Sequence, residues 1–103
     1  MIDKNKQPDK NGFTKYDHDK LRYELISPSA MKGMARVLTY GANKYVAHNW
    51  KKGTIDRYVG AAYRHMEAWR QGEKIDPESH LPHLEHLITN IMFLIELDKD
   101  NVK

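Results

Sequence analysis

The stretch from residue 81 to residue 97 constrains the fold of this chain most. Apolar side chains recur there every three or four positions, namely Leu84, Leu87, Ile88, Ile91 and Ile95. This spacing places them on one wide face of a helix, a face that other helices must cover. The pattern predicts a helical bundle in which Leu81–Leu97 is the third helix. His83, His86 and Asn90 fall on a neighbouring face of that helix.

Two earlier stretches have the same periodicity. A first helix is predicted to begin after Ser27 and Pro28 and to run to Tyr45, and a second spans Ile55–Arg70 with His65 and Trp69 facing inward. The intervening residues 46–53 and the polar residues 73–79 are predicted to be loops, and Leu21–Ile26 a short extended segment. The expected class is all-α, a small bundle of three to four helices with an extended N-terminal arm.

A chain of 103 residues is enough for one domain and one modest core. We expect a flexible arm over residues 1–14, a helical domain over 15–97 and a frayed end over 98–103. The sequence has no cysteine, which excludes disulfides and thiolate chemistry. Because so short a chain buries limited apolar surface, a homo-oligomer that extends the core is expected.

The formal net charge of +3 suits an anionic ligand, but acidic and basic residues are interspersed. The lack of a basic stripe on any predicted helix argues against nucleic-acid binding. No stretch is apolar enough for a signal peptide or a membrane span, so a cytoplasmic protein without membrane contact is expected.

The strongest chemical signal is the concentration of four of the six histidines between residues 65 and 86, around an acidic turn. His83 and His86 lie three residues apart on a predicted helix, so both can grip one metal ion or one phosphate. The alternative interpretation is that both belong to a solvated or capping face and that His65 belongs to a hydrogen-bonded core. In the turn, Glu73, Asp76 and Glu78 offer oxygen ligands for magnesium holding a triphosphate, although Asp76 also suits a helix N-cap and Glu78 a first helical turn.

A divalent metal is therefore expected, magnesium or manganese, with zinc or iron as candidates if imidazoles are ligands. Several cations are candidates for phosphate contact, and two aromatic rings can stack on a base. These candidates are Lys15, Lys20, Arg22, Lys44, Arg57 and Arg64, with Tyr45 and Trp50 as the rings. The sequence has no phosphate-binding glycine loop, dinucleotide fingerprint, nucleophile elbow or zincin motif.

An ordered series of short strings spans residues 15–97. It comprises Lys15-Tyr16-Asp17, Tyr40-Gly41-Ala42, Asn49-Trp50, Arg57-Tyr58, Arg64-His65, Gly72-Glu73, Glu78-Ser79 and His83-Leu84. Together they resemble the phage-type dATP/dGTP diphosphohydrolase domain. The resemblance implies hydrolysis of purine deoxynucleoside triphosphates to monophosphate and pyrophosphate, in phage nucleotide metabolism within the infected cell. It also implies kinship with the MazG-like all-α nucleotide pyrophosphohydrolases.

On this reading, Glu73, Asp76 and Glu78 hold the metal, while His65, His83 and His86 complete its shell or act as general base. The substrate contacts are the cations and rings named above together with Asn49. An alternative is a phage protein that binds or sequesters nucleotides without turning them over. The resemblance leads us to expect glycine after Ser79; His80 stands there, so the turn before the third helix is expected to differ.

Overall fold

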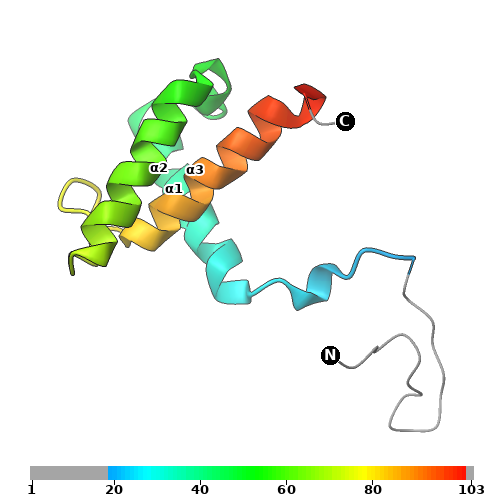
Figure 1. The fold of residues 1–103 in the computed structure, drawn as a ribbon, viewed down its shortest axis with the longest axis horizontal. Coiled ribbons are helices and arrows are strands. Elements are labelled where there is room, and N and C mark those ends of the chain that lie inside the picture. The colour runs from blue at the N-terminus through cyan, green and yellow to red at the C-terminus, as the bar shows by residue number, and fades with distance from the viewer. Residues whose placement is uncertain (1–18, 102–103) are drawn as a thin grey trace, which may run out of the picture.

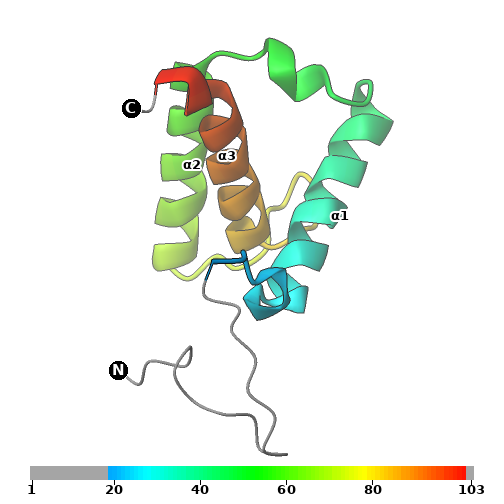
Figure 2. The same cartoon turned by 90° about the vertical axis from the view of Figure 1, so that its right-hand side faces the viewer.

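A computed structural model describes residues 19–101, and three helices dominate this part of the chain. Helix α1 spans Pro28–Lys44, α2 spans Ile55–Arg70 and α3 spans His83–Asp98. Three short 3₁₀ turns accompany them: η2 at Tyr23–Leu25, η3 at Asn49–Lys52 and η4 at Lys99–Asn101. Helix α3 lies between the other two and packs against both (Figures 1 and 2). The all-α prediction is confirmed.

The helix starts follow from local capping. The Ser27 hydroxyl accepts a hydrogen bond from the Ala30 amide at 3.1 Å, and Pro28 occupies the first helical position, where its missing N–H costs nothing. Thr54 caps α2 in the same way through the Arg57 amide. Helix α2 ends before Gly72, whose φ of 105° is open to glycine but strained for other residues.

Two boundary predictions are wrong. Helix α3 begins at His83 rather than Leu81, because the residues before it pair with each other across the preceding loop. Residues 21–26 are not simply extended: the Leu25 and Ile26 amides donate to carbonyls three residues back, which forms turn η2. Residues 1–18, and with them the whole of the predicted arm over residues 1–14, lie outside the described residues.

The core is small and partly polar. Val37 and Ala62 are its buried apolar side chains, while His83, Thr89 and Asn90 are the buried polar ones, all within the described residues. The prediction that the other helices cover the aliphatic face of α3 is therefore wrong. Helices α1 and α2 cover the histidine-bearing face instead and leave most of the aliphatic stripe in solvent. Trp69, predicted to be a core residue, is also exposed.

Helices α1 and α3 cross closely at Gly33. A Cβ atom there would lie 2.6 Å from Cγ of Glu85, so any larger residue would displace the Glu85 side chain. One turn later, Arg36 donates to both Glu85 carboxylate oxygens, with Nε 3.0 Å from Oε1. The intrinsic helical cost of Gly33 is thus offset by an ion pair between the two helices.

The loop between α2 and α3 is fastened by backbone hydrogen bonds. The Asp76 amide donates to the Leu81 carbonyl at 2.8 Å, and the His83 amide donates to the Lys74 carbonyl at 2.9 Å. An isolated β-bridge joins Ile75 to Pro82. At the tip, His80 adopts φ of 62°, the left-handed region that favours glycine. The turn thus keeps a glycine-type backbone although a histidine occupies it.

No helix among the described residues combines the length and the apolar character needed to cross a membrane.

We predict that His80→Gly stabilises the protein. Relief of the left-handed strain is worth about 1 kcal/mol after the extra chain entropy of glycine is subtracted. Thermal unfolding should show a higher Tm for this variant. Lys74→Gly, in the same loop but without a positive φ, is the matched control and should lower the Tm; a gain of equal size in both variants contradicts the strain argument.

Candidate active site

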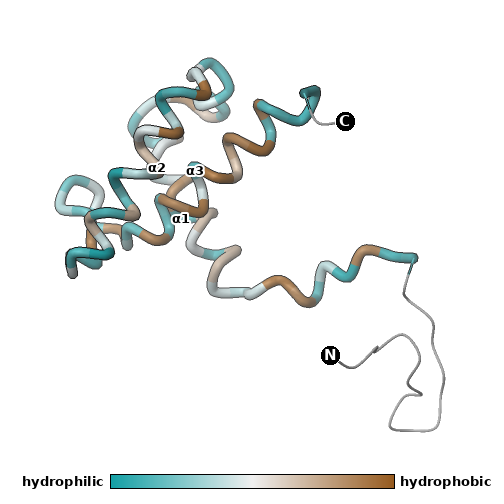
Figure 3. The backbone as a smooth tube through the Cα atoms, in the orientation of Figure 1, coloured by the Kyte–Doolittle hydropathy of each residue, from teal (hydrophilic) through white to brown (hydrophobic). Residues whose placement is uncertain are grey.

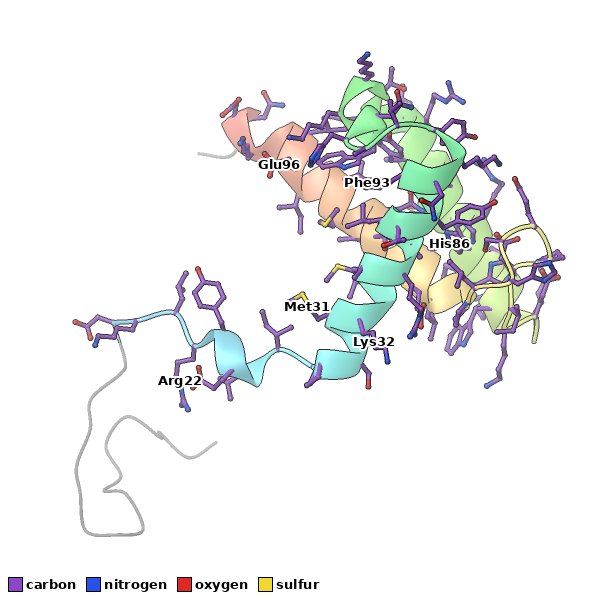
Figure 4. The ribbon with its side chains drawn as sticks, turned by 180° about the vertical axis from the view of Figure 1, so that it is seen from behind. Arg22, Met31, Lys32, His86, Phe93 and Glu96 are labelled. Carbon is purple, nitrogen blue, oxygen red and sulfur yellow. The ribbon has the colours of Figure 1, made fainter. Side chains whose placement is uncertain are left out.

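Three structural elements bring the candidate catalytic residues together. His65 comes from α2, His83 and His86 from the first turn of α3, and Glu73 and Asp76 from the loop that joins these helices. Figure 4 shows His86 between α1 and α2, near the loop that joins α2 to α3. The sequence prediction that three elements converge at this point is therefore met for these five side chains.

A hydrogen-bonded relay connects the loop to α2 through His83. Nε2 of His83 lies 2.9 Å from Oε1 of Glu73, and Nδ1 of His83 lies 2.8 Å from Nδ1 of His65. An ionised carboxylate only accepts, so His83 donates from Nε2. When His83 is neutral, its Nδ1 has no proton and accepts a hydrogen bond from the N–H at Nδ1 of His65. The bare lone pair of His65 is then on Nε2.

Nε2 of His65 has no hydrogen-bond partner among the described residues. Every fully buried side-chain nitrogen or oxygen of these residues does have a partner. This atom therefore reaches solvent. The relay holds a neutral imidazole with its basic nitrogen turned to water, which is the arrangement required to accept a proton or a hydrogen bond from a bound water molecule.

The second half of the cluster is centred on Ser79. Its hydroxyl lies 2.6 Å from Nε2 of His86 and donates to Asp76 at 3.1 Å, while the Leu81 amide donates to it at 3.2 Å. Since its single proton goes to Asp76, Ser79 accepts from His86, and all its hydrogen-bonding capacity is used. Ser79 thus organises the loop through these three hydrogen bonds. The His86 ring also stacks on the His65 ring, with 4.6 Å between the ring centroids.

The surroundings of His65 and His86 favour their neutral forms. Burial, reinforced by the nearby His86 and His83, lowers the pKa of His65 to about 4. Burial also lowers the pKa of His86, against the opposing effect of Asp76. For Asp76, burial acts to raise the pKa, but hydrogen bonds from the Glu78 amide and Ser79 outweigh it and lower the pKa. An ionised Asp76 beside neutral imidazoles is the resulting charge state at neutral pH.

The three predicted metal-binding carboxylates do not converge. Glu73 faces His83, Asp76 faces Ser79, and Glu78 turns away to pair with Lys44 at 2.6 Å. Within residues 19–101, no group of three or more histidine, aspartate or glutamate side chains is arranged to hold a metal ion. These residues therefore do not fit a resident metal centre as they stand.

Three of the predicted substrate contacts meet in one cleft of about 390 Å³, which we call the Arg57 cleft. Its lining residues are Tyr45, Asn49, Lys52, Gly53, Arg57 and Tyr58. Lys52 and Arg57 form no side-chain ion pair with the described residues, so both charges are available to an anion. The cleft combines two free cations, two phenol rings and an amide, a composition suited to a nucleotide.

The other predicted contacts lie elsewhere. Trp50 stacks on Phe93 at 4.7 Å, and the Lys51 ammonium lies over its ring, so Trp50 packs against the core rather than offering a free face. Lys44 is held by Glu78, which raises its pKa. Arg64 is exposed beside His65. Arg22 lies on the projecting segment before α1, far from His86 (Figure 4). Lys20 precedes it in the chain, and Lys15 lies outside the described residues.

Sequence reasoning did not single out several residues that define the site. Lys52 and Tyr58 line the Arg57 cleft, and Tyr40 meets His86 edge-on at 6.4 Å. A second cleft of about 440 Å³ lies between α1 and the loop, where Lys32, Arg36 and Ser79 are among its walls. No local pattern marks these residues, because their roles depend on contacts across the fold; the Arg57-Tyr58 string was the nearest signal.

Comparison with known proteins identifies the family. Residues 10–103 match the family described as "dATP/dGTP diphosphohydrolase, N-terminal". A protein of Salmonella phage PMBT28 named "dATP/dGTP diphosphohydrolase" is 34% identical over 83 residues. The chain belongs to the dATP/dGTP diphosphohydrolase N-terminal family. The family resemblance drawn from the sequence is thereby confirmed.

The matched region is 81% of this chain but only 29% of the phage relative. The family description likewise refers to the N-terminal part of such proteins. No solved structure matches the chain, so kinship with the MazG-like enzymes stays a prediction.

We predict that stability falls as pH drops from about 6.5 to about 4. His65 is neutral in the folded protein down to a pKa of about 4, whereas an unfolded histidine binds its proton near 6.5, so the unfolded state takes up more protons in this window. The loss should be about 2 kcal/mol once solvent screening of this half-buried group is allowed for. Urea unfolding between pH 7.5 and 4.5 measures it. His65→Gln should flatten the dependence; an unchanged slope in that variant rules out His65 as its source.

Proposed function

We propose that this chain acts in the hydrolysis of dATP or dGTP to the deoxynucleoside monophosphate and pyrophosphate. The proposal is supported by membership of the diphosphohydrolase family and by the name of the phage relative. The observation that carries it is the Glu73–His83–His65 relay, which presents a neutral, solvent-facing imidazole nitrogen within a cluster of polar residues around the buried His83. Such a group suits deprotonation of the water that attacks a phosphoanhydride.

In this proposal His65 is the base and His83 its orienting partner. Glu73 fixes the tautomer of His83, and His83 in turn fixes the proton of His65 on Nδ1. A pKa of about 4 makes His65 a weak base in the free protein. An approaching triphosphate brings negative charge, which raises that pKa towards neutrality and strengthens the base when substrate is present.

The nucleotide is proposed to enter through the Arg57 cleft, where Lys52 and Arg57 contact phosphate and Tyr45 the base. A nucleoside triphosphate in cells carries its own divalent ion, which usually keeps one or two protein carboxylates and the phosphates as ligands. The magnesium or manganese ion that we expect therefore arrives bound to the substrate. Removal of the ion with EDTA should then abolish turnover without unfolding the protein.

We predict that the Arg57 cleft determines substrate binding and that the histidine cluster determines the rate of the chemical step. Arg57→Gln should raise KM about tenfold with little change in kcat, because it removes a charge-assisted phosphate contact. His65→Gln should lower kcat about 100-fold with little change in KM, because it removes the base. Steady-state kinetics with dATP and dGTP measure both effects. Arg70→Gln, an exposed change at the far end of α2, is the control and should leave both constants unchanged.

A second candidate is a nucleotide-binding module without turnover. It is favoured by two observations: within the described residues no three-ligand metal group exists, and His65 follows Arg57 by eight residues, about 12 Å along α2. On this view the Arg57 cleft binds the nucleotide and the chemistry, where it occurs, belongs to other residues of longer relatives.

Product analysis separates the two candidates. The purified protein is incubated with dATP, dGTP, ATP, GTP or dCTP, with magnesium and separately with manganese, and products are resolved chromatographically. Formation of dAMP or dGMP with pyrophosphate, lost in His65→Gln, supports hydrolysis. Saturable nucleotide binding by calorimetry without any product, weakened by Arg57→Gln, supports the binding module. If no product forms and no nucleotide binds, both candidate functions are wrong.

A further inference from the structure

A continuous aliphatic stripe runs along the outside of α3. Leu84, Ile88, Ile91 and Ile95 follow one another at spacings of four, three and four residues, which places them on one helical face about 16 Å long. Leu84, Ile91 and Ile95 are 43%, 42% and 66% exposed. The stripe is not covered by α1 or α2, since these helices pack on the opposite, histidine-bearing face.

A second apolar surface lies on the segment before α1. Leu21, Tyr23, Leu25 and Ile26 are exposed, and Met31 continues this surface onto the first turn of α1. We call residues 21–31 the leading segment. Figures 1 and 3 show it projecting from the bundle with hydrophobic stretches along it, and Figure 4 places Met31 on the side of α1 that faces α3.

We propose that these two surfaces bind each other between two copies of this chain. In a two-fold dimer the leading segment of each copy packs on the α3 stripe of its partner, so both apolar surfaces are covered at once and the assembly closes. A standard interface buries roughly 800 Å² from each partner. Eight large apolar side chains, each 42% to 79% exposed, supply area of that order. The proposal is independent of the proposed function.

Charge complementarity favours the pairing of α1 with α3 over that of α3 with α3. Helix α1 contains Lys32, Arg36 and Lys44 and no acidic residue, whereas α3 contains Glu85, Glu96 and Asp98 and neither lysine nor arginine. Lys32 and Asp98 form no ion pair with other described residues. Two α3 helices face to face would bring like charges together, while α1 brings cations to an acidic helix; the leading segment adds no net charge, because Arg22 pairs with Glu24.

Light scattering coupled to size-exclusion chromatography tests the dimer. The wild-type chain should have twice its 12.1 kDa mass. Ile95→Glu should give a monomer that is still helical by circular dichroism, because it places a charge in the stripe. Val46→Glu is the matched control, since Val46 is a β-branched residue of similar exposure in the loop after α1, and it should remain dimeric. A monomeric wild type, or a dimeric Ile95→Glu, overturns the proposal.

Cross-linking tests the arrangement even if Ile95→Glu fails to fold. The chain contains no cysteine, so Met31→Cys and Ile95→Cys each introduce a single thiol. Mixed and oxidised, these two variants should form a disulfide-linked heterodimer of the two proteins. Val46→Cys mixed with Ile95→Cys should not. A dimer that forms without the Met31→Cys to Ile95→Cys link rejects the leading segment as the occupant of the stripe.

Discussion

The arrangement of this bundle depends on the need to satisfy one buried imidazole at both nitrogens. His83 is 5% exposed, and an unpaired polar atom at such a position costs on the order of 1–3 kcal/mol. Glu73 meets one nitrogen from the loop and His65 meets the other from α2. Together with the backbone hydrogen bonds of the loop, that requirement ties the loop and α2 to the start of α3.

The polar interior provides less hydrophobic stabilisation than an aliphatic core would, but it defines the packing of the helices more narrowly. With Thr89 and Asn90 also buried, the face of α3 that meets its neighbours is much less apolar than its outer face. Fully satisfied polar networks define a unique packing, whereas a purely aliphatic contact tolerates alternatives. Helix α3 thus turns its polar, hydrogen-bonded face inward, while much of its apolar surface stays exposed to solvent.

Much of the fold could be predicted because helix signals are local. The caps at Ser27 and Thr54 and the periodicity of 55–70 depend on neighbours a few residues away, so the limits of α1 and α2 were predicted to within a residue. The direction in which α3 faces could not be predicted this way. An aliphatic stripe normally marks the buried side, and only the three-dimensional pairing of His83 with Glu73 and His65 decides otherwise. The grouping of His65, His83 and His86 followed from their clustering in sequence, whereas the separate partners of Glu73, Asp76 and Glu78 depend on contacts that no spacing encodes.

The start of α3 is unusual in having no side-chain cap. Its first amide, that of His83, is instead satisfied by the Lys74 carbonyl from the preceding loop. The loop therefore serves as the helix cap, and the same loop supplies Glu73 and Asp76 to the histidines. Fraying of the first turn of α3 and dismantling of the cluster are consequently a single local unfolding event. The histidine cluster therefore stays ordered only while the first turn of α3 and the loop hold each other.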